Sequence, residues 1–403
     1  MAALDISTAT AILKEYYSNQ RVTDLTYKNC PLYAMLQKIK DFGGESYPLP
    51  MRVTNPQGRS ATFSNAQAQK VPSVYRGFQL TRARDYSLAS ITSEAIMASE
   101  NNAGAFLKLA TAEIDGAIDS LRRAVAWSCY GDGSGVIGQI ASLTGATVTL
   151  ANTEDVVHFE VNQTVNAWTA LSGGTQHSWA TSTAPLVTGV DRDTGIITFS
   201  ENVTGGSATL AANDYLFVAG DRGNKLKGLA AWVPDTAPTS GDSFFGVDRS
   251  VDATRLAGSR MTMTGKPIDE ALIDMARRIG REGGEPDYAF LGFAKYAALE
   301  KTMQNRVEYE DVEVGNISFR GIALNGPKGK ITVLPDQDCP TNRGYMLKMD
   351  SFGFYSLKEP IQILNADGNQ MLRESSADAY EVRIATFSNM GCNEPKSNGV
   401  LKF

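Results

Sequence analysis

Residues 131–138 read GDGSGVIG and contain a G-x-G-x-x-G match, the pattern that cradles the pyrophosphate of a dinucleotide. In that motif a strand leads into the glycines and a helix begins at the last of them, so that its N–H groups face the phosphates. Here the order is reversed, because residues 103–130 have a helical period and the ATVTL run that follows is typical of a strand. We therefore interpret the glycines as the turn after a helix. A nucleotide-binding enzyme that uses the Gly131–Gly138 loop is the weaker alternative.

The histidines and cysteines form no recognisable catalytic or metal-binding pattern. The only histidines, His158 and His177, both lie in a weakly charged, β-rich part of the sequence, where we expect ordinary strand residues. The four cysteines are far apart and include no C-x-x-C, which is typical of reduced thiols in a cytoplasm: Cys30, Cys129, Cys339 and Cys392. We predict no enzyme activity, no catalytic residue, no cofactor and no metal site.

Two acidic stretches match cation-binding loops only in part. The DRDTG segment from Asp191 to Gly195 begins like a calcium loop, but Ile196 and Asn202 stand where the loop needs Gly and Glu. A hairpin turn explains this segment better. The acidic run Glu308–Glu313 is expected to be a solvated loop face rather than a cation site.

The helix expected at 103–130 has one apolar face. Side chains at steps of three and four line that face: Ile114, Ile118, Leu121, Val125 and Cys129. A polar residue in front of the helix can cap its start: Ser99, Asn101 or Asn102. Gly131 suits a left-handed stop at its end.

Composition describes an ordinary globular protein of 403 residues, with 42% hydrophobic and 20% charged residues. The net charge of −6 argues against a general nucleic-acid binder, which would carry a basic surface. The N-terminus has no basic region before its apolar residues, so we do not expect a signal peptide. The longest uncharged stretches are rich in Thr, Ser, Asn and Gly, and we expect no membrane span.

A period of two begins near residue 45 and predicts a long hairpin. Apolar residues alternate with polar residues and prolines in SYPLPMRV at 46–53, and Pro48 and Pro50 mark an edge strand because they cannot donate to a ladder. A returning strand carries apolar residues of one parity: Val74, Phe78, Leu80, Tyr86 and Leu88. Since an isolated two-stranded ribbon is marginal in water, we expect a neighbouring subunit to cover its apolar side.

Residues 136–227 form a distinct block. Only 12 of these 92 residues are charged, about 13% against 20% for the chain, which marks a domain boundary. Short runs rich in Thr and Val alternate with Gly, Asn and Ser turns, the pattern of a small antiparallel barrel or sandwich: ATVTL, VVHFEV, LVTGV, IITFS and DYLFVAG.

The N-terminal and C-terminal parts mix helices and strands. A helix is expected in PLYAMLQKIK, with Pro31 at its first position, and another in PIDEALIDMARRIGREGG, with Pro267 at its start and Gly283 after it. PDYAFLGF has the pattern of a buried strand and AKYAALEKTM that of a helix. Further strands are expected in ISFRGIALNG, KITVLPD, GYMLKMD, GFYSLK and YEVRIATFSNMGC. The fold class is α+β.

This order of parts resembles the major capsid protein of tailed bacteriophages with the Hong Kong 97 type of fold. CYGDGSG resembles the end of the family's spine helix, although the matching Gly228-Leu229 segment comes about ninety residues later, with the β-rich block between. FRGIALNGPKGKITVLPD resembles the axial-domain strands and YEVRIATFSNMG the final peripheral-domain strand. The resemblance implies these parts: an N-terminal arm (1–44), an extended-loop hairpin (45–92), a spine helix (93–135), an inserted all-β domain (136–227), a continued peripheral domain (228–265), an axial domain (266–350) and C-terminal axial and peripheral strands (351–403).

The function implied by the resemblance is structural. Copies of the chain would assemble into pentamers and hexamers of an icosahedral virion shell around double-stranded DNA, which is packaged without sequence-specific binding. The hairpin would reach over the adjacent subunit through these residues: Tyr47, Leu49, Met51, Arg52, Arg59, Phe63, Lys70, Arg76 and Phe78.

The resemblance also implies partners and a location. The chain itself would be the main partner, with scaffolding and portal proteins during assembly in the host cytoplasm and a cement or decoration protein on the finished capsid. A phage tail or adhesion protein, in which the 136–227 block binds a receptor, is the alternative structural interpretation.

Overall fold

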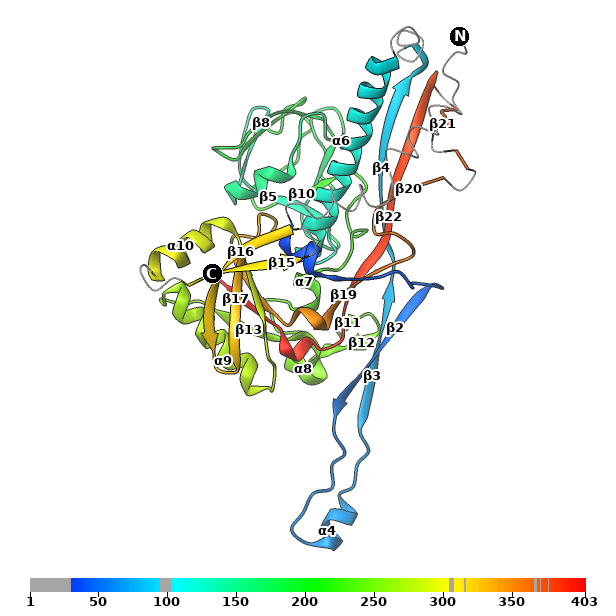
Figure 1. The fold of residues 1–403 in the computed structure, drawn as a ribbon. Coiled ribbons are helices and arrows are strands. Elements are labelled where there is room, and N and C mark those ends of the chain that lie inside the picture. Colours follow the sequence, from blue (N-terminus) through cyan, green and yellow to red (C-terminus); the bar gives the residue numbers. More distant parts are fainter. Residues whose placement is uncertain are drawn as a thin grey trace. The chain divides into compact units, whose positions relative to one another are not determined.

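The computed structural model describes residues 30–94, 103–303, 308–314, 317–365, 368–369, 371–375 and 377–403, and only the backbone of residues 103–110 (Figure 1). Most of the predicted N-terminal arm and the predicted caps Ser99, Asn101 and Asn102 lie outside the described residues. The chain divides into two compact units, one of residues 1–130 with 232–403 and one of Gly131–Ala231. No helix among the described residues is both long and apolar enough to cross a membrane.

The first sheet of unit 1 is built around one long strand, β22 (Ala379–Cys392). Its strand order is β1 (Gln37–Ile39), β19 (Phe352–Ser356), β22 and β20 (Gln362–Ile363), and β4 (Ala83–Thr92) and β21 (Leu372–Arg373) also pair with β22. The long helix α6 (Ala103–Tyr130) runs along β4 and β22 (Figure 1). The five side chains predicted to form its apolar face are all buried, so that prediction is confirmed.

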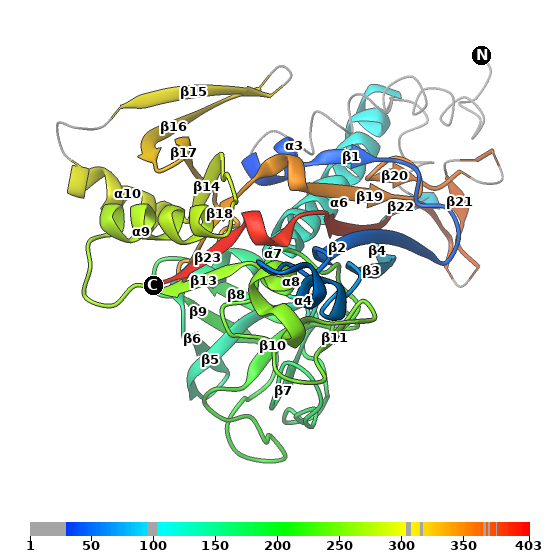
Figure 2. The same cartoon turned by 90° about the horizontal axis from the view of Figure 1, so that it is seen from below.

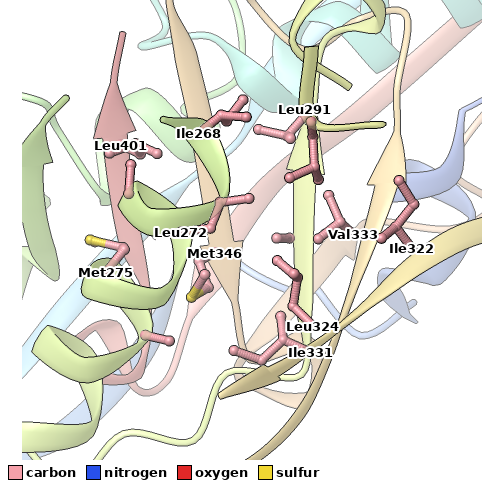
Figure 3. Close-up of a cluster of buried hydrophobic side chains, with 14 of the residues drawn as sticks. Ile268, Leu272, Met275, Leu291, Ile322, Leu324, Ile331, Val333, Met346 and Leu401 are labelled. Atoms are coloured by element: carbon pink, nitrogen blue, oxygen red, sulfur yellow. The ribbon is translucent and has the colours of Figure 1, made fainter. Parts of the chain in front are cut away.

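The second sheet of unit 1 has seven strands, in the order β13 (Ser259–Thr262), β23 (Gly399–Lys402), β18 (Arg343–Leu347), β14 (Tyr288–Leu291), β17 (Gly329–Pro335), β16 (Ile317–Gly326) and β15 (Tyr309–Val314). Helices α9 (Ile268–Arg281) and α10 (Phe293–Met303) lie side by side against it (Figure 2). Figure 3 shows the core between them, where Leu272 and Met275 of α9 face strand residues such as Met346. The strands and both helices predicted in this region are confirmed.

Smaller elements complete unit 1. They are α3 (Pro31–Met35), β2 (Ser46–Thr54), α4 (Phe63–Ala68), β3 (Val74–Thr81), β11 (Ser243–Phe244), β12 (Val247–Asp248), η2 (Arg249–Asp252), α8 (Ala253–Ala257), η4 (Met349–Ser351) and η5 (Pro395–Ser397). The helix predicted in PLYAMLQKIK is only half right. Its second half forms β1, which pairs in parallel with β19 because an open sheet edge is available there.

Unit 2 contains a six-stranded antiparallel sheet in the order β7 (Val165–Trp168), β10 (Tyr215–Val218), β5 (Val136–Thr144), β6 (Thr147–Leu150), β9 (Ile196–Phe199) and β8 (Val187–Asp191). Its core gathers Ile140, Phe159, Trp179 and Leu216. The β-rich block at 136–227 lies within this unit, and α7 (Leu229–Trp232) follows where the chain passes back to unit 1. The strand predicted in VVHFEV is wrong, because residues Thr153–His158 form the 3-10 helix η1.

Candidate functional site: the β2–β3 hairpin

The strands β2 and β3 form an antiparallel two-stranded sheet that ends in α4 (Figure 1). We call residues 46–81 the arm. Leu49 stands opposite Phe78, and a register shift follows between Arg52 and Thr54. Since β2 pairs with β3 alone, the prediction of an edge strand is confirmed. The returning strand reaches Leu88 with one interruption, since β3 ends at Thr81 and β4 begins at Ala83, but β4 pairs along β22, so Tyr86 and Leu88 lie outside the hairpin.

The base of the arm is buried by its own chain. Phe78 is 0% exposed, and its ring centroid lies 5.1 Å from that of Trp232 and 6.1 Å from that of Phe244. Leu49 is also buried, with a methyl group close to the backbone of Gly391 in β22. Leu49 and Phe78 were predicted as contacts with a neighbouring subunit. We correct that prediction, because both side chains lie in the core of unit 1.

Hydrogen bonds also fix the base of the arm. The N–H of Gln79 donates to the Phe245 carbonyl oxygen at 2.9 Å, which ties β3 to the β11–β12 turn. The Arg255 guanidinium donates to the Val53 carbonyl oxygen at 2.7 Å, and the Asn389 amide donates to the Thr81 carbonyl oxygen at 2.6 Å. Both strands of the arm are thus anchored to unit 1 at its base.

Tyr47 and Met51 lie in β2 on either side of the buried Leu49. Both are half-buried, and Tyr47 faces Tyr355 of the same chain with ring centroids 4.9 Å apart. The other predicted contact residues are exposed: Arg52, Arg59, Phe63, Lys70 and Arg76.

The tip of the arm has no core. None of the residues of α4 is buried, and Phe63 at its start is 82% exposed. Val71 and Tyr75 are exposed as well. Paired backbone hydrogen bonds of 2.9 Å between Gln57 and Val71 close the loop, but no apolar side chain between them is buried. Large apolar groups left in water on a short helix are typical of a surface that binds a partner.

The arm carries charge of one sign. Its four charged residues are Arg52, Arg59, Lys70 and Arg76, and it contains no Asp or Glu. Since the whole chain has 38 basic and 44 acidic residues, the rest of the chain has a net charge of −10. Arg76 contributes to holding the pKa of Asp248 below its usual range, although hydrogen bonds from Ser250 are the larger cause. The arm is therefore basic, whereas the rest of the chain is acidic overall.

The glycine-rich loop forms a turn, as predicted. Helix α6 ends at Tyr130 and β5 begins at Val136, so no helix follows the glycines. A side chain on Gly135, where φ is 79°, would come within 2.7 Å of the Asp221 carbonyl oxygen. The glycines of this loop are thus needed for a close approach of the backbone to residues 221–227. Gly131 was predicted as the left-handed stop, but the positive φ falls at Gly133 and Gly135, so that detail is wrong.

A polar cluster in unit 2 was not foreseen from the sequence. The ring of His177 lies with Nε2 2.8 Å from the Asp214 carboxylate and Nδ1 3.0 Å from the Thr209 hydroxyl. Thr209 also accepts a hydrogen bond from the Ser178 N–H, and Asp214 accepts one from the Ala211 N–H. These bonds hold loops 176–178 and 209–214 together. The partners lie more than thirty residues apart, so sequence spacing gave no signal of them.

The other predicted positions show no site chemistry. His158 is set in η1, and burial lowers its pKa to about 3, so it is neutral at ordinary pH. Asp191 holds the predicted hairpin turn between β8 and β9 by accepting the N–H groups of Asp193 and Thr194. The acidic run Glu308–Glu313 was predicted as a loop face, but its residues from Tyr309 form β15, an edge strand. Among the described residues, no three His, Cys, Asp or Glu side chains are placed to hold a metal ion.

Comparison with known proteins finds relatives by structure alone. No protein-family model and no curated protein sequence matches the chain. The capsid asymmetric unit of cyanophage A-1(L) matches with a TM-score of 0.55 and 12% identity, over 93% of each chain. The capsid of a native GTA particle matches with a TM-score of 0.45 and 9% identity, over 91% of this chain and 88% of that one. The SrpI encapsulin complex from Synechococcus elongatus PCC 7942 matches with a TM-score of 0.44 and 9% identity, over 92% and 87%.

The cyanophage match covers almost the whole of both chains, which at 12% identity establishes the fold. The resemblance to phage capsid proteins, first seen in the order of sequence elements, is thus confirmed at the level of structure. The chain has the mixed α+β fold of a bacteriophage capsid protein.

Proposed function

We propose that this chain is the major capsid protein of a tailed bacteriophage, with the Hong Kong 97 type of architecture, and that it is a structural protein rather than an enzyme. Many copies assemble, as pentamers and hexamers, into an icosahedral shell that encloses double-stranded DNA. The fold shared with a cyanophage capsid supports this proposal. Assembly takes place in the host cytoplasm and the product is the virion capsid.

The observation that carries the proposal is the contrast between the two ends of the arm. The base is anchored by its own chain, whereas the tip exposes Phe63, Val71 and Tyr75. A neighbouring copy would cover these side chains and pair its acids with the basic residues of the tip. Exposed ion pairs contribute only about 0.2–1 kcal/mol each, so buried area supplies most of the interface energy. Obligate interfaces bury about 2,000–5,000 Å² or more.

The contact set proposed from the structure differs from the one expected from sequence. It keeps Arg52, Arg59, Phe63, Lys70 and Arg76, which are exposed, and leaves out Leu49 and Phe78. Tyr47 and Met51, which are half-buried, lie at the margin of this contact set.

The remaining parts of the proposal concern the other segments and partners. The seven-stranded sheet with α9 and α10 corresponds to the axial domain, whose head-to-tail contacts would close into rings. Unit 2 corresponds to the inserted β domain. Scaffolding, portal and cement proteins are further expected partners.

Electron microscopy of the purified chain tests the function. We expect closed particles with fivefold and sixfold clusters, whereas fibres or isolated trimers would favour a tail or adhesion protein. Phe63→Asp in the tip should prevent particles while leaving the monomer folded. Val161→Asp is the matched control, because Val161 is an exposed apolar residue of unit 2, outside the arm. Equal loss of particles in both variants would contradict the role of the arm.

A further inference from the structure

The strand β15 has an open edge. It ends the seven-stranded sheet and pairs with β16 alone among the described strands (Figure 2). The Ala323 N–H donates to the Glu308 carbonyl oxygen at 2.8 Å, so every second residue from Glu308 onwards bonds to β16. The backbone N–H and C=O groups of the residues between them point away from β16, at Tyr309, Asp311 and Glu313. These three residues are exposed, so the outer edge of β15 faces solvent.

The strand β3 of the arm has a second open edge. The Gln79 N–H donates to the β11–β12 turn, so the backbone groups at every second residue before Gln79 also point away from β2. These residues are Tyr75 and Gly77, and both are exposed. The outer edge of β2 is different, because Pro48 and Pro50 occupy its outward positions and have no N–H to donate. Pairing with a further strand is therefore favoured at β3.

The two open edges carry opposite charge. The segment 308–314 has four acids and no basic residue. The arm has four basic residues and no acid, and Arg76 lies in β3 between its two outward-facing residues. Two bases of the neighbouring strands offset only part of the acidic charge: Lys330, which lies 3.2 Å from Glu310, and Arg320, which stands opposite Asp311.

These charges select which edges can meet. Two β15 edges would place acids opposite acids, two β3 edges would place bases opposite bases, and like charges directly opposite one another destabilise a pair of strands. A β15 edge beside a β3 edge brings opposite charges together. That contact joins different surfaces of two copies, so it can close into a ring instead of stopping at a dimer. The charges thus disfavour both symmetric pairings and favour the head-to-tail one.

We propose that the β15 edge of one copy pairs with the β3 edge of another copy, so that the arm extends the seven-stranded sheet of its neighbour. The inference rests on the proposed assembly and names the surface that receives the arm. In β3 the anchors to unit 1 involve Gln79 and Thr81, so residues 75–77 keep their outward backbone groups for the neighbour.

Substitution of Gly77 tests the backbone pairing. Gly77→Pro removes one outward N–H and leaves the hydrogen bonds between β2 and β3 in place, because the backbone of Gly77 points away from β2. Gly77→Ala is the matched control, since it keeps the N–H and its new methyl group would meet no atom within 4 Å. Electron microscopy should show that Gly77→Ala assembles like the wild type, whereas Gly77→Pro needs a protein concentration higher by about tenfold or more.

Charge reversal tests the choice of partner with the backbone unchanged, and it decides the question if Gly77→Pro perturbs the arm. Asp311→Lys with Glu313→Lys should prevent assembly, because it places bases opposite the basic arm. Arg52→Glu with Arg76→Glu should prevent it as well, because it places acids opposite β15. A chain that carries all four substitutions should assemble again, since the attraction is restored with its sign reversed.

Hydrogen exchange reads the strand contact directly. The amides of residues 309, 311 and 313 should exchange freely in the unassembled chain and become protected in particles, whereas peptide 343–347 of the central strand β18 should not change. The control for net charge reverses two exposed acids of unit 2, Glu154→Lys with Asp193→Lys, and should leave assembly intact.

The outcomes separate this inference from the proposed function. Wild-type particles in which the β15 amides stay unprotected would overturn the inference and leave the shell function standing. Equal assembly of the wild type, Gly77→Pro and both charge-reversed pairs would have the same meaning. Absence of particles from the wild type would instead overturn the proposed function, and the inference with it.

Discussion

Replacement of a phenylalanine of the arm by alanine should lower the unfolding free energy strongly at Phe78 and hardly at all at Phe63. Phe78→Ala removes a fully buried ring that packs edge-on against Trp232 and Phe244. Truncating a buried Phe costs about 3–5 kcal/mol of unfolding free energy. That range already includes the two aromatic pairs, worth about 0.5–1.5 kcal/mol each. Phe63→Ala truncates a ring that is 82% exposed, and the unfolding free energy should change by less than about 0.5 kcal/mol.

The assay is urea denaturation of the unassembled chain. Unfolding is monitored by hydrogen exchange of peptides from β22, which lies beside the base of the arm. Phe78→Ala should lower the urea midpoint of these peptides and Phe63→Ala should not. In assembly assays Phe63→Ala should have the larger effect. It should weaken particle formation at a concentration where both variants are folded. Equal destabilisation by the two substitutions, or none from Phe78→Ala, would refute the division of the arm into a self-anchored base and a partner-dependent tip.

Three further predictions concern unit 2. Gly135→Ala should destabilise it by more than Gly145→Ala, measured by thermal denaturation. Both glycines have a positive φ, which costs a side chain about 1–2 kcal/mol, but only at Gly135 would the new methyl group meet a backbone oxygen, that of Asp221 at 2.7 Å. His177→Ala should cost at least about 1–3 kcal/mol, because it leaves buried polar groups without their partner, and hydrogen exchange of peptide 205–214 should increase. Because the pKa of His158 is lowered to about 3 by burial, its contribution to stability is complete above pH 6.5 and is lost as pH falls towards 3. The difference in Tm between wild type and His158→Gln should therefore change over that range, and a constant difference would contradict it.

Periodicity predicted the long helix and the central strands because tertiary packing agrees with the local pattern there. The five apolar residues of α6 face the sheet, and the residues of α9 that recur at steps of three and four form the core of the second sheet. The strand predicted in VVHFEV was wrong because tertiary packing does not agree with the local pattern there. Its Val and Phe residues favour a strand, but Glu154 and Asp155 stand in the first turn of η1, and Val156 within η1 and Phe159 directly after it enter the core instead.

The arm shows what a sequence period cannot decide. Alternation identified the side of the hairpin that is apolar, but it does not say which surface covers that side. Phe78 and Phe63 are equally apolar in sequence, yet one enters an aromatic cluster with Trp232 and the other stays in water. That cluster depends on Phe244, more than 160 residues away, so its existence became visible only in the folded chain. The same holds for Asp336, whose hydrogen-bond partners Leu32 and Tyr130 lie far from it in sequence.

The division of the arm also suggests an order of events in assembly. The base can fold with the monomer, because its apolar residues and backbone groups find partners in unit 1. The helix α4 at the tip has six residues and no buried side chain, and helices that short are marginal in water without tertiary contacts. Covering Phe63 by a neighbour would therefore supply the packing that α4 lacks. Part of the binding energy is then spent on ordering the tip, which weakens each single contact and lets misplaced subunits dissociate before a shell closes.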